Sequence, residues 1–345
     1  MSRRRPRMLA VLTLLVSSLG VAACTTAGDY DPTPLYTPAA SASPSLSSTS
    51  TASPSPSPSA PSGTDIVSTN CVQSYAPAAT LPSPGQMPAG TTMRRIQDRG
   101  RLIAGVSADT RLLGARNPVS GKIEGFDIDL LHAVSQAIFG EPNRIEYRVI
   151  TAAQREPLLQ DKSVDIVARN MTINCARWKK IAFSGEYYRD GQKVLVRRDA
   201  TTTDGAKVTS IKDLAGQKVC APKETSSMEK LLTFKELQPV GADTHTGCLV
   251  LFQQGEVDAI TGDETVLAGL ASQDPYAVVV QAPAFTVEPL GLGINRADVD
   301  FVRFVNGVLE QMRADGRWAK SSTTWLADAL GKAPAPPAPV YGRAP

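Results

Sequence analysis

The sequence predicts an α/β fold in which helices cover parallel sheets, and it predicts that the fold occurs twice, as two similar lobes. Strand-like and helix-like stretches alternate along the chain, as in repeated β–α–β units. The alternation restarts after Gly191. Two segments, 162–167 (KSVDIV) and 255–260 (GEVDAI), each combine a turn, a Val-Asp pair and apolar residues. This weak internal similarity favours two lobes of one kind.

The first series of elements lies between residues 101 and 168. A helix is expected just after Gly125, because apolar residues recur there at helical spacing and Asp127 is a suitable N-cap. A second, short helix is expected at 155–160. Three segments have the apolar or alternating pattern of strands: 101–106, 145–150 and 164–168.

The second series follows Gly191. Residues 225–227 (TSS) are suited to start a helix that runs to about residue 232, and the last helix of the body is expected at 299–312. Trp318 and Trp325 come next, and we interpret them as packing residues rather than as an aromatic ligand-binding motif. Strands are expected at 218–221, 255–260 and 291–294.

Both ends of the chain differ from this body in composition. Arg3, Arg4, Arg5 and Arg7 precede an apolar run from Met8 to Ala23, which is short for a membrane span. The run ends in Val-Ala-Ala before Cys24, which resembles a bacterial lipobox and implies cleavage before Cys24 and acylation of its thiol. An ordinary signal peptide and an apolar N-terminal helix are the alternatives. Residues 24–70, rich in Ser, Thr and Pro, are expected to form a disordered stalk, and residues 331–345 a disordered tail.

The remaining cysteines and the overall charge restrict the class of protein. Cys71, Cys175, Cys220 and Cys248 form an even set, which in an oxidising compartment predicts two disulfides. Three pairings are possible; we favour Cys220 with Cys248, which leaves Cys71 with Cys175, and free buried thiols are the alternative. With two histidines, His132 and His245, and no CxxC motif, no metal site is expected. The net charge is +3 without a basic stripe, which argues against nucleic-acid binding.

Five stretches stand out in order along the chain: 102–107 (LIAGVS), 124–130 (EGFDIDL), 164–182 (VDIVARNMTINCARWKKIA), 183–188 (FSGEYY) and 255–267 (GEVDAITGDETVL). Together they resemble the polar-amino-acid-binding proteins of ABC importers, and among these most the actinobacterial glutamate- and glutamine-binding lipoproteins. The resemblance implies a two-lobed periplasmic-binding-protein fold of type II, with two hinge strands and a ligand in the interlobe cleft. It implies an N-terminal extension at 71–91, a first lobe of 92–188 plus 290–330, and a second lobe of 189–289. The chain would cross between the lobes near 188–191 and 288–290, which allows hinge closure.

The resemblance also implies which groups hold the α-carboxylate of an amino acid. Arg177, five residues after Thr172, matches the family arginine, and its planar fork suits a carboxylate. The alternative for Arg177 is a solvated charge at a helix start. Thr225 and Ser226 match the helix start that supplies N–H donors, although a plain helix cap would use the same residues.

The ammonium and the side chain of the ligand require other groups. Asp263 matches the family's acidic residue for the ammonium, with an N-cap as the alternative role, and Asn170 would add a backbone carbonyl. Arg111, in the loop after the first strand, resembles the arginine of glutamate/aspartate binders, with a solvent-facing loop charge as the alternative. Arg169 and Lys223 would add positive charge. We therefore expect aspartate or glutamate to be preferred, with asparagine and glutamine as second choices.

Three other functions compete with transport. Some proteins of this fold are dehydratases, but neither histidine lies in a candidate loop and no GxSxG, HExxH or P-loop motif occurs, so no enzyme is expected. A sensor that presents its closed form to a membrane receptor would have the same binding chemistry. A structural envelope lipoprotein would not explain the spacing of Thr172, Arg177 and Asp263. We expect a monomeric, lipid-anchored protein without a cofactor, on the extracytoplasmic face of the cell membrane, which delivers its ligand to an ABC permease.

Overall fold

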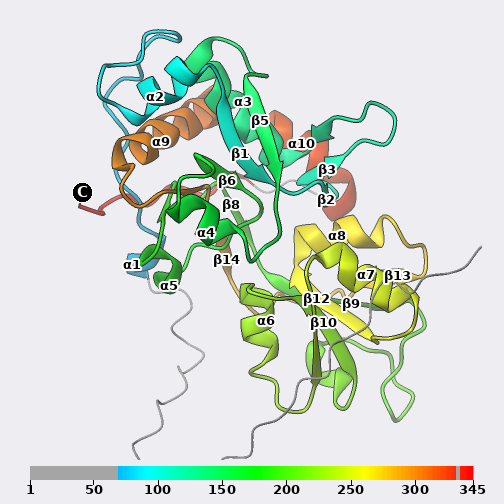
Figure 1. Cartoon of the computed structure of the whole chain (residues 1–345). Helices are drawn as coiled ribbons and strands as arrows, with labels where there is room; N and C mark the ends of the chain where they lie inside the picture. The colour runs from blue at the N-terminus through cyan, green and yellow to red at the C-terminus, as the bar shows by residue number, and fades with distance from the viewer. Residues whose placement is uncertain (1–68, 332–334, 345) are drawn as a thin grey trace, which may run out of the picture. The chain divides into compact units, whose positions relative to one another are not determined.

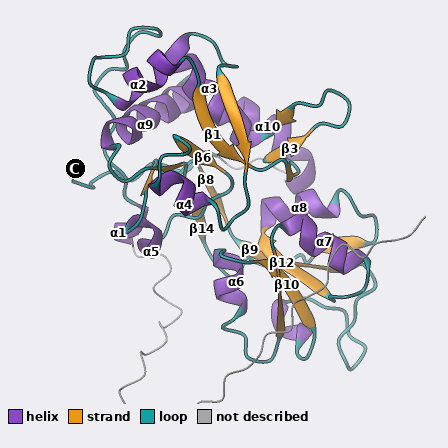
Figure 2. Cartoon of the chain, in the orientation of Figure 1, coloured by secondary structure: helices purple, strands orange, loops and turns teal. Residues whose placement is uncertain are grey.

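The computed structural model describes residues 69–331 and 335–344, which all belong to one unit, Ser59–Pro345. The predicted signal peptide, the acylated Cys24 and the stalk up to residue 68 lie outside the described residues. Residues 69 and 70, expected to belong to a disordered stalk, instead begin a short helix, α1 (Thr69–Val72). Helices flank the strands in each of two lobes (Figure 2).

The first lobe is built mainly from the N-terminal half of the described chain, and α9 and α10 return to it from the C-terminal end (Figure 1). Its helices are α2 (Thr92–Arg99), α3 (Phe126–Phe139), α4 (Arg155–Gln160), α5 (Cys175–Trp178), α9 (Val299–Ala314) and α10 (Arg317–Leu330). Its strands are β1 (Leu102–Val106), β2 (Asp109–Thr110), β3 (Gly114–Arg116), β4 (Ile123–Glu124), β5 (Ile145–Val149), β6 (Ile166–Ala168), β7 (Ala182–Phe183) and β15 (Gly293–Ile294).

The second lobe contains the residues between the two crossings. Its helices are the 3-10 helix η2 (Ile211–Leu214), α6 (Ser226–Leu231), α7 (His245–Gln253) and α8 (Glu264–Ala271). Its strands are β9 (Gln192–Arg197), β10 (Lys218–Pro222), β11 (Gln238–Ala242), β12 (Ala259–Asp263) and β13 (Ala277–Val279).

The two main sheets share one topology. Their strand orders are β5-β1-β6-β15-β7 and β11-β10-β12-β9-β13, so β1 lies between β5 and β6 in the first lobe as β10 lies between β11 and β12 in the second. These three strands are parallel, as predicted, but β15 and β9 run antiparallel to both of their neighbours in their sheets. The prediction of purely parallel sheets was therefore incomplete. The added strands β9 and β15 directly follow the crossings, where the chain enters its new lobe in the opposite direction.

The crossings form a two-stranded ribbon between the lobes. Strand β8 (Tyr188–Asp190) pairs antiparallel with β14 (Glu288–Leu290), and Glu288 lies opposite Asp190. Both strands lie near the middle of Figure 1, between the two main sheets. The site described below lies where the two lobes face each other across this ribbon.

The Val-Asp repeat has the same structural role in both lobes. Asp165 accepts the N–H of Ile103 at 2.8 Å and donates its own N–H to the Ile103 carbonyl at 2.8 Å. Asp258 makes the same pair with Lys218, at 2.8 and 2.9 Å. Asp165 thus ties the loop before β6 to the start of β1, and Asp258 ties the loop before β12 to the start of β10. The internal similarity in the sequence marks an equivalent position in two lobes of equivalent topology.

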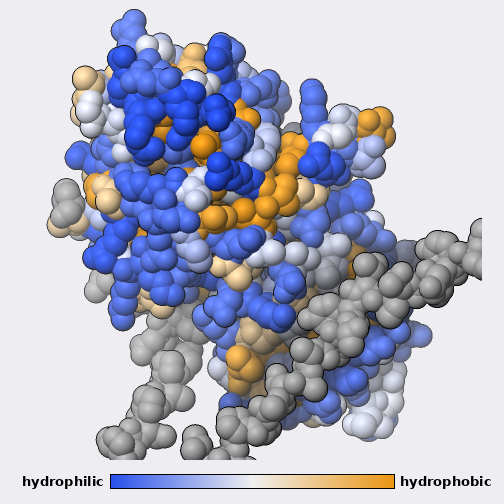
Figure 3. All heavy atoms as spheres, viewed as in Figure 1, coloured by the Kyte–Doolittle hydropathy of each residue, from blue (hydrophilic) through white to orange (hydrophobic). Residues whose placement is uncertain are grey.

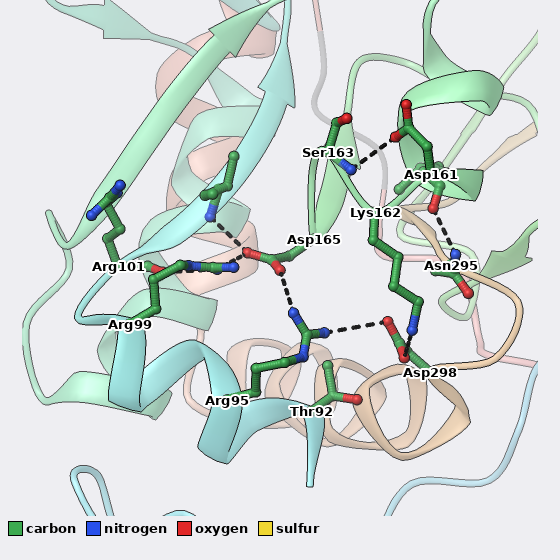
Figure 4. Close-up of polar contacts among 12 residues, drawn as sticks. Thr92, Arg95, Arg99, Arg101, Asp161, Lys162, Ser163, Asp165, Asn295 and Asp298 are labelled. Carbon is green, nitrogen blue, oxygen red and sulfur yellow. Dashed lines mark hydrogen bonds and ion pairs between the residues drawn. The ribbon is translucent and has the colours of Figure 1, made fainter.

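The two aspartates differ in their surroundings: helix α2 covers Asp165 in the first lobe, whereas Asp258 in the second lobe is exposed. Arg95 and Arg99 of α2 both pair with Asp165, whose side chain is 2 % exposed (Figure 4). Arg95 also reaches Asp298, which Lys162 contacts at 2.7 Å. This ion network fixes α2 and the start of α9 against the amino ends of β1 and β6.

The two ends of the described chain meet on the first lobe. Ser74 pairs with Tyr341, and the N–H of Ser74 donates to the Val340 carbonyl at 2.9 Å. The guanidinium of Arg343 lies 3.7 Å from the centre of the Trp178 ring. The prediction of a disordered tail is therefore wrong for residues 335–344, because its Pro/Ala-rich composition does not reveal the strand-like partner that the N-terminal extension provides.

Both disulfides have the favoured pairing. Cys71 is bonded to Cys175, and Cys220 is bonded to Cys248. The first bond joins the N-terminal extension to α5, and the second joins β10 to α7. Within the described residues no helix is long and apolar enough to cross a membrane. On the face drawn in Figure 3, hydrophilic residues cover most of both lobes, and hydrophobic residues gather in a band near the middle.

One predicted helix cap was placed incorrectly. Helix α3 begins at Phe126 with Gly125 as its N-cap, and Asp127 lies inside the first turn. Gly125 has φ +143°, and a Cβ there would lie 2.3 Å from the Leu113 carbonyl oxygen, so only glycine fits. Asp127 is instead buried, where it accepts the Asn170 N–H at 2.8 Å and the Tyr187 hydroxyl at 2.7 Å. Burial raises its pKa to about 6.

Candidate functional site

The candidate site lies at the carboxyl ends of parallel strands from both lobes. In open α/β sheets this end of the strands is where ligands bind. Ten residues line a small cavity there: Arg155, Arg169, Asn170, Thr172, Arg177, Thr225, Ser226, Ser227, His245 and Asp263. The first five follow β5 and β6 of the first lobe. The others follow β10 and β11, or end β12, in the second lobe.

Arg177 is buried and held in place by the first lobe. It lies in α5, is 5 % exposed, and donates from Nη1 to the Thr172 carbonyl at 2.7 Å. Its Nε lies 3.5 Å from Glu156 Oε1. Asn174 caps α5 by accepting the Arg177 N–H at 2.8 Å. This burial excludes the alternative of a solvated charge at a helix start.

Hydroxyl groups from the two lobes meet beside Arg177. Thr172 Oγ1 lies 3.1 Å from Ser226 Oγ. Thr225 caps α6 by accepting the Met228 N–H at 3.1 Å, and its hydroxyl donates to the Pro222 carbonyl at 2.6 Å. Thr225 is therefore a helix cap that also lines the cavity, and its contact with a ligand stays a prediction. The start of α6 thus brings the Ser226 hydroxyl to Thr172.

Asp263 offers an unpartnered oxygen to the cavity. It is 3 % exposed and stands at the N-cap position of α8, yet its side chain makes no capping hydrogen bond. Asn170 Nδ2 donates to Oδ2 at 3.4 Å, whereas Oδ1 has no hydrogen-bond partner within the described residues. The alternative role of Asp263 as a helix cap is therefore excluded. A buried carboxylate oxygen with this geometry can accept a hydrogen bond from a cation.

Two further buried arginines line the same cavity. Arg155 donates to the carbonyls of Ala152 at 2.9 Å, Arg169 at 3.3 Å and Glu224 at 3.3 Å. Arg169 donates from Nε to the Ile150 carbonyl at 2.8 Å. Within the described residues no ion pair joins either of them to a carboxylate. Among the described residues carbonyl oxygens are therefore their hydrogen-bond partners, and carboxylates act on them only as more distant charges, Asp263 on Arg155 and Asp109 on Arg169.

His245 completes the wall in the second lobe. It is the first residue of α7, and its Nε2 is buried without a hydrogen-bond partner within the described residues. A Cβ on Gly262 would lie 2.5 Å from Nε2, so the glycine leaves space for the imidazole. Burial, and then the charge of Arg169, lower the pKa of His245 to about 3. The ring is neutral at physiological pH in this environment.

The lining carries an excess of positive charge. Three guanidinium groups, from Arg155, Arg169 and Arg177, face one lining carboxylate, Asp263. Burial, and then the charges of Arg177 and Arg169, hold the pKa of Arg155 well below its usual value. Burial, together with the charges of Glu288 and Asp190, raises the pKa of Asp263 well above its usual value. An anionic group near the arginines and a cationic group near Asp263 would relieve both costs.

The structure separates two predicted residues from this cavity. Arg111 is exposed and lines a different groove, at the surface beside Asp109 and Leu112. The side chain of Lys223 is 62 % exposed and lies 3.3 Å from Asp243. Arg111 is directed outward because its loop belongs to the β2–β3 hairpin, whose backbone packs on Gly269 of the second lobe. The expected roles of Arg111 and Lys223 at the ligand are therefore not supported.

Three lining residues were missed from the sequence: Arg155, Ser227 and His245. Each follows the carboxyl end of a strand, β5, β10 or β11. Ligands bind at the carboxyl ends of the strands in open α/β sheets, and this rule could have identified all three residues. The statement that neither histidine lies in a candidate loop was wrong for His245. Its strand, β11, was not predicted.

Direct contacts between the lobes close the site. Besides the Thr172–Ser226 and Asn170–Asp263 contacts, Arg155 Nη2 donates to the Glu224 carbonyl at 3.3 Å, and Thr246 Oγ1 donates to the Asp109 carbonyl at 3.1 Å. The space left in the cavity is about 10 Å³, which is about the room that one water molecule needs. A larger ligand can enter only if the lobes separate about the β8–β14 ribbon.

Comparison with known proteins identifies the family. Residues 102–328 match the bacterial extracellular solute-binding proteins, family 3. The chain belongs to this family. It is 31 % identical over 240 residues to the ABC transporter glutamine-binding protein GlnH of Bacillus subtilis, covering 68 % of this chain and 84 % of that protein. It is 30 % identical over 262 residues to the glutamate-binding protein GluB of Corynebacterium efficiens, covering 72 % and 86 %.

Solved structures support the same fold for this solute-binding protein. A cysteine-binding protein from Campylobacter jejuni superimposes with a TM-score of 0.65 at 20 % sequence identity, covering 73 % of this chain and all of that one (100 %). Together with the strand orders, this is the type II periplasmic-binding-protein fold. The solute-binding protein is not an enzyme, and its family is extracytoplasmic. One of the relatives named here is the glutamine-binding protein of an ABC transporter, and none supports the sensor alternative.

Proposed function

We propose that this solute-binding protein binds an acidic amino acid, aspartate or glutamate, and releases it to an ABC importer. The observation that carries the proposal is the buried cavity in which three guanidinium groups face one carboxylate. A zwitterionic amino acid without a charged side chain brings one anionic and one cationic group. Aspartate and glutamate bring a second anionic group, which matches the excess of arginine. Asparagine and glutamine keep an acceptor oxygen for the arginines and are the second choices.

Each charged group of the ligand has a partner in this proposal. The α-carboxylate binds Arg177, with Thr172 and Ser226 as hydroxyl donors beside it. The ammonium binds the unpartnered oxygen of Asp263, and Asn170 contacts the same carboxylate. The side-chain carboxylate is left for Arg155, Arg169 and His245. Charge-assisted bonds of this kind are stronger than neutral ones, particularly in a buried site.

Transport follows from lobe closure. The groups proposed to bind the ligand come from both lobes, so a bound amino acid favours the closed arrangement by its differential affinity. A permease can recognise the two lobes when they are held together. Two relatives described above are named as glutamine- and glutamate-binding proteins, one of them of an ABC transporter, which supports a transported amino acid.

We also propose that the protein is anchored by a lipid at Cys24. The support is the basic and apolar N-terminal sequence that ends in Val-Ala-Ala-Cys, followed by a Ser/Thr/Pro-rich stretch that leads to the folded lobes. In the native host, Cys24→Ser is expected to release the protein from the membrane fraction into the soluble fraction. Equal membrane retention of wild type and variant would exclude the lipid anchor.

Calorimetric titration of the full-length protein in detergent with the twenty amino acids tests the proposed ligand. We expect binding of aspartate and glutamate with a dissociation constant near 1 µM, about 8 kcal/mol, and weaker binding of their amides. Arg177→Ala should abolish all binding, because it removes the partner of the α-carboxylate that every amino acid carries. Arg94→Ala, an exposed arginine of α2, is the matched control and should bind normally. Absence of amino-acid binding, or equal binding of many amino acids, would overturn the proposal.

A further inference from the structure

Helix α8 is capped in an unusual way. Its N-cap residue, Asp263, has φ −60° and ψ 140°, an extended conformation typical of an N-cap, and aspartate is a favoured capping residue. Thr91, Asn174, Thr225 and Thr244 stand at the same position of other helices and cap them with their own side chains. The side chain of Asp263 does not cap α8.

A carboxylate from the hinge takes this role. Asp190, the last residue of β8, accepts the Glu264 N–H on Oδ1 at 3.0 Å and the Thr265 N–H on Oδ2 at 3.3 Å. The Thr265 hydroxyl also donates to Oδ2. The first N–H groups of α8 are therefore bonded to a residue more than seventy positions earlier in the chain. Asp190 supplies the cap that Asp263 is placed to supply.

The backbone around Asp190 holds this arrangement in place. The Gly191 N–H donates to Asp190 Oδ1 at 2.8 Å, and the Glu264 N–H also reaches the Gly191 carbonyl at 3.0 Å. Gly191 fits closely, because a Cβ there would lie 2.5 Å from Ala284 Cβ and 2.7 Å from the Thr286 carbonyl oxygen. The hinge strand and the start of α8 thus form one bonded unit.

We propose that Asp190 is a positioning residue that keeps the carboxylate of Asp263 away from its own helix and directed into the cleft. Asp190 holds the Glu264 and Thr265 N–H groups, the first two of α8, and a capping side chain at Asp263 can accept from the second of them, so the two carboxylates compete for the Thr265 N–H. Because Asp190 holds these groups, Asp263 Oδ1 remains unpartnered beside the cavity, where the proposed function places the ligand ammonium. Without Asp190, the Asp263 side chain would turn to cap α8 and lose its contact with the ammonium. This inference rests on the proposed function.

The test compares two ligands that differ in the ammonium group. Glutamate and glutarate share both carboxylates, and only glutamate carries an amine. In the full-length wild type we expect glutamate to bind much more tightly than glutarate. In Asp190→Ala this preference should fall about tenfold, equivalent to about 1.4 kcal/mol, mainly through weaker glutamate binding. Asp263→Asn should reduce the preference at least as much, and adding Asp190→Ala to it should cause little further change in the ratio.

Two controls separate positioning from a general loss of stability. Asp190→Asn retains an amide oxygen that can accept an α8 N–H, so it should preserve most of the preference and also covers the case in which Asp190→Ala fails to fold. Thr91→Ala removes the cap of α2, far from the cavity, and should lower the unfolding midpoint without changing the ratio. A wild-type preference that is unchanged in Asp190→Ala, or lost equally in Asp190→Asn, would overturn the inference alone. A wild type that binds neither ligand would overturn the proposed function as well.

Discussion

Arg155 differs from the surface arginines of this protein in its partners. Its buried guanidinium donates to carbonyl oxygens, and among the described residues it forms no ion pair with a carboxylate. A guanidinium desolvated in this way interacts strongly with any anion that reaches it. In the proposed site the only anion left for it is the side-chain carboxylate of the ligand. Arg155 should therefore decide between acidic amino acids and their amides.

Arg155→Met tests this assignment because methionine keeps much of the apolar volume and removes the charge. We expect the affinity for glutamate and aspartate to fall about 30- to 100-fold, in line with about 2–3 kcal/mol for a hydrogen bond between charged groups. Glutamine and asparagine should lose less than about fivefold. The measurement is calorimetric titration of all four ligands.

Arg111→Ala is the matched control for Arg155→Met. The sequence assigned the side-chain carboxylate to Arg111, but the structure places this arginine in an exposed groove. Its removal should change the affinity for every one of the four ligands by less than about twofold. Selective loss of aspartate and glutamate binding in Arg111→Ala, with normal discrimination in Arg155→Met, would restore the original assignment.

Single residues at the site were predicted from the sequence where a motif or a strand identified them. Thr172, Arg177 and Asp263 lie in segments with recognisable order and line one cavity. His245 was missed because β11 contains Pro239 and Gly241, residues that are depleted in strands, and β11 is an edge strand paired only with β10. Arg111 was misplaced because a sequence does not show toward which side a hairpin turns its loop.

At the scale of elements, the periodicity of apolar residues predicted most helices and central strands. Helix α3 and strands β1 and β5 lie where the pattern placed them, within one or two residues. The Val-Asp repeat was the sequence signal with the clearest structural meaning, because both aspartates bond the first residue or two of the neighbouring strand. The surroundings of the two aspartates differ, and the repeat itself does not reveal this difference.

That difference predicts unequal effects of the same substitution. Asp165 is buried and pairs with Arg95 and Arg99, so Asp165→Ala should lower the free energy of unfolding by about 2–4 kcal/mol, somewhat less than for a fully buried pair because the arginines are partly exposed. Asp258 is exposed and holds only Lys218, so Asp258→Ala should cost about 1 kcal/mol. Urea unfolding of both variants measures the difference. Equal losses would show that the arginines of α2 contribute little to stability.

At the scale of the molecule, the N-terminal extension is attached to the helix that carries Arg177. The Cys71–Cys175 bond joins it to α5, and Trp178 Nε1 donates to the Cys71 carbonyl at 2.6 Å. Ser74 bonds the Phe183 carbonyl and pairs with the C-terminal segment. Local sequence patterns predicted the disulfide but not the pairing of the two ends, because that pairing depends on partners separated by almost the whole described chain.

The stability of the whole molecule should depend on the protonation of His245. Its pKa is lowered to about 3 in the folded protein by burial and by Arg169, whereas an unfolded histidine has a pKa near 6.5. Between these values the unfolded chain binds a proton that the folded chain does not. The folded state therefore has its full stability from this group above about pH 6.5 and loses it as the pH falls toward 3.

Asp127 and Asp190 act in the opposite direction. Burial raises the pKa of each to about 6, so below pH 6 the folded state binds protons that the unfolded state, with a pKa near 3.8, does not yet bind. These two carboxyls therefore make the folded state more stable as the pH falls from 6 toward 4. Their contribution is present in the wild type and in a histidine variant alike, so it cancels when the two are compared.

His245→Gln isolates the histidine contribution, because glutamine is neutral at every pH and occupies a similar volume. We expect the free energy of unfolding of the wild type, relative to the variant, to decrease as the pH falls from 6 to 4, by up to about 1.4 kcal/mol per pH unit. Urea unfolding at pH 7, 6, 5 and 4 without ligand gives the two curves. Parallel curves would show that the imidazole has the same pKa in the folded as in the unfolded protein, and hence that it becomes a cation below about pH 6.5, whereas diverging curves would leave Arg155 and Arg169 as the cations of the site.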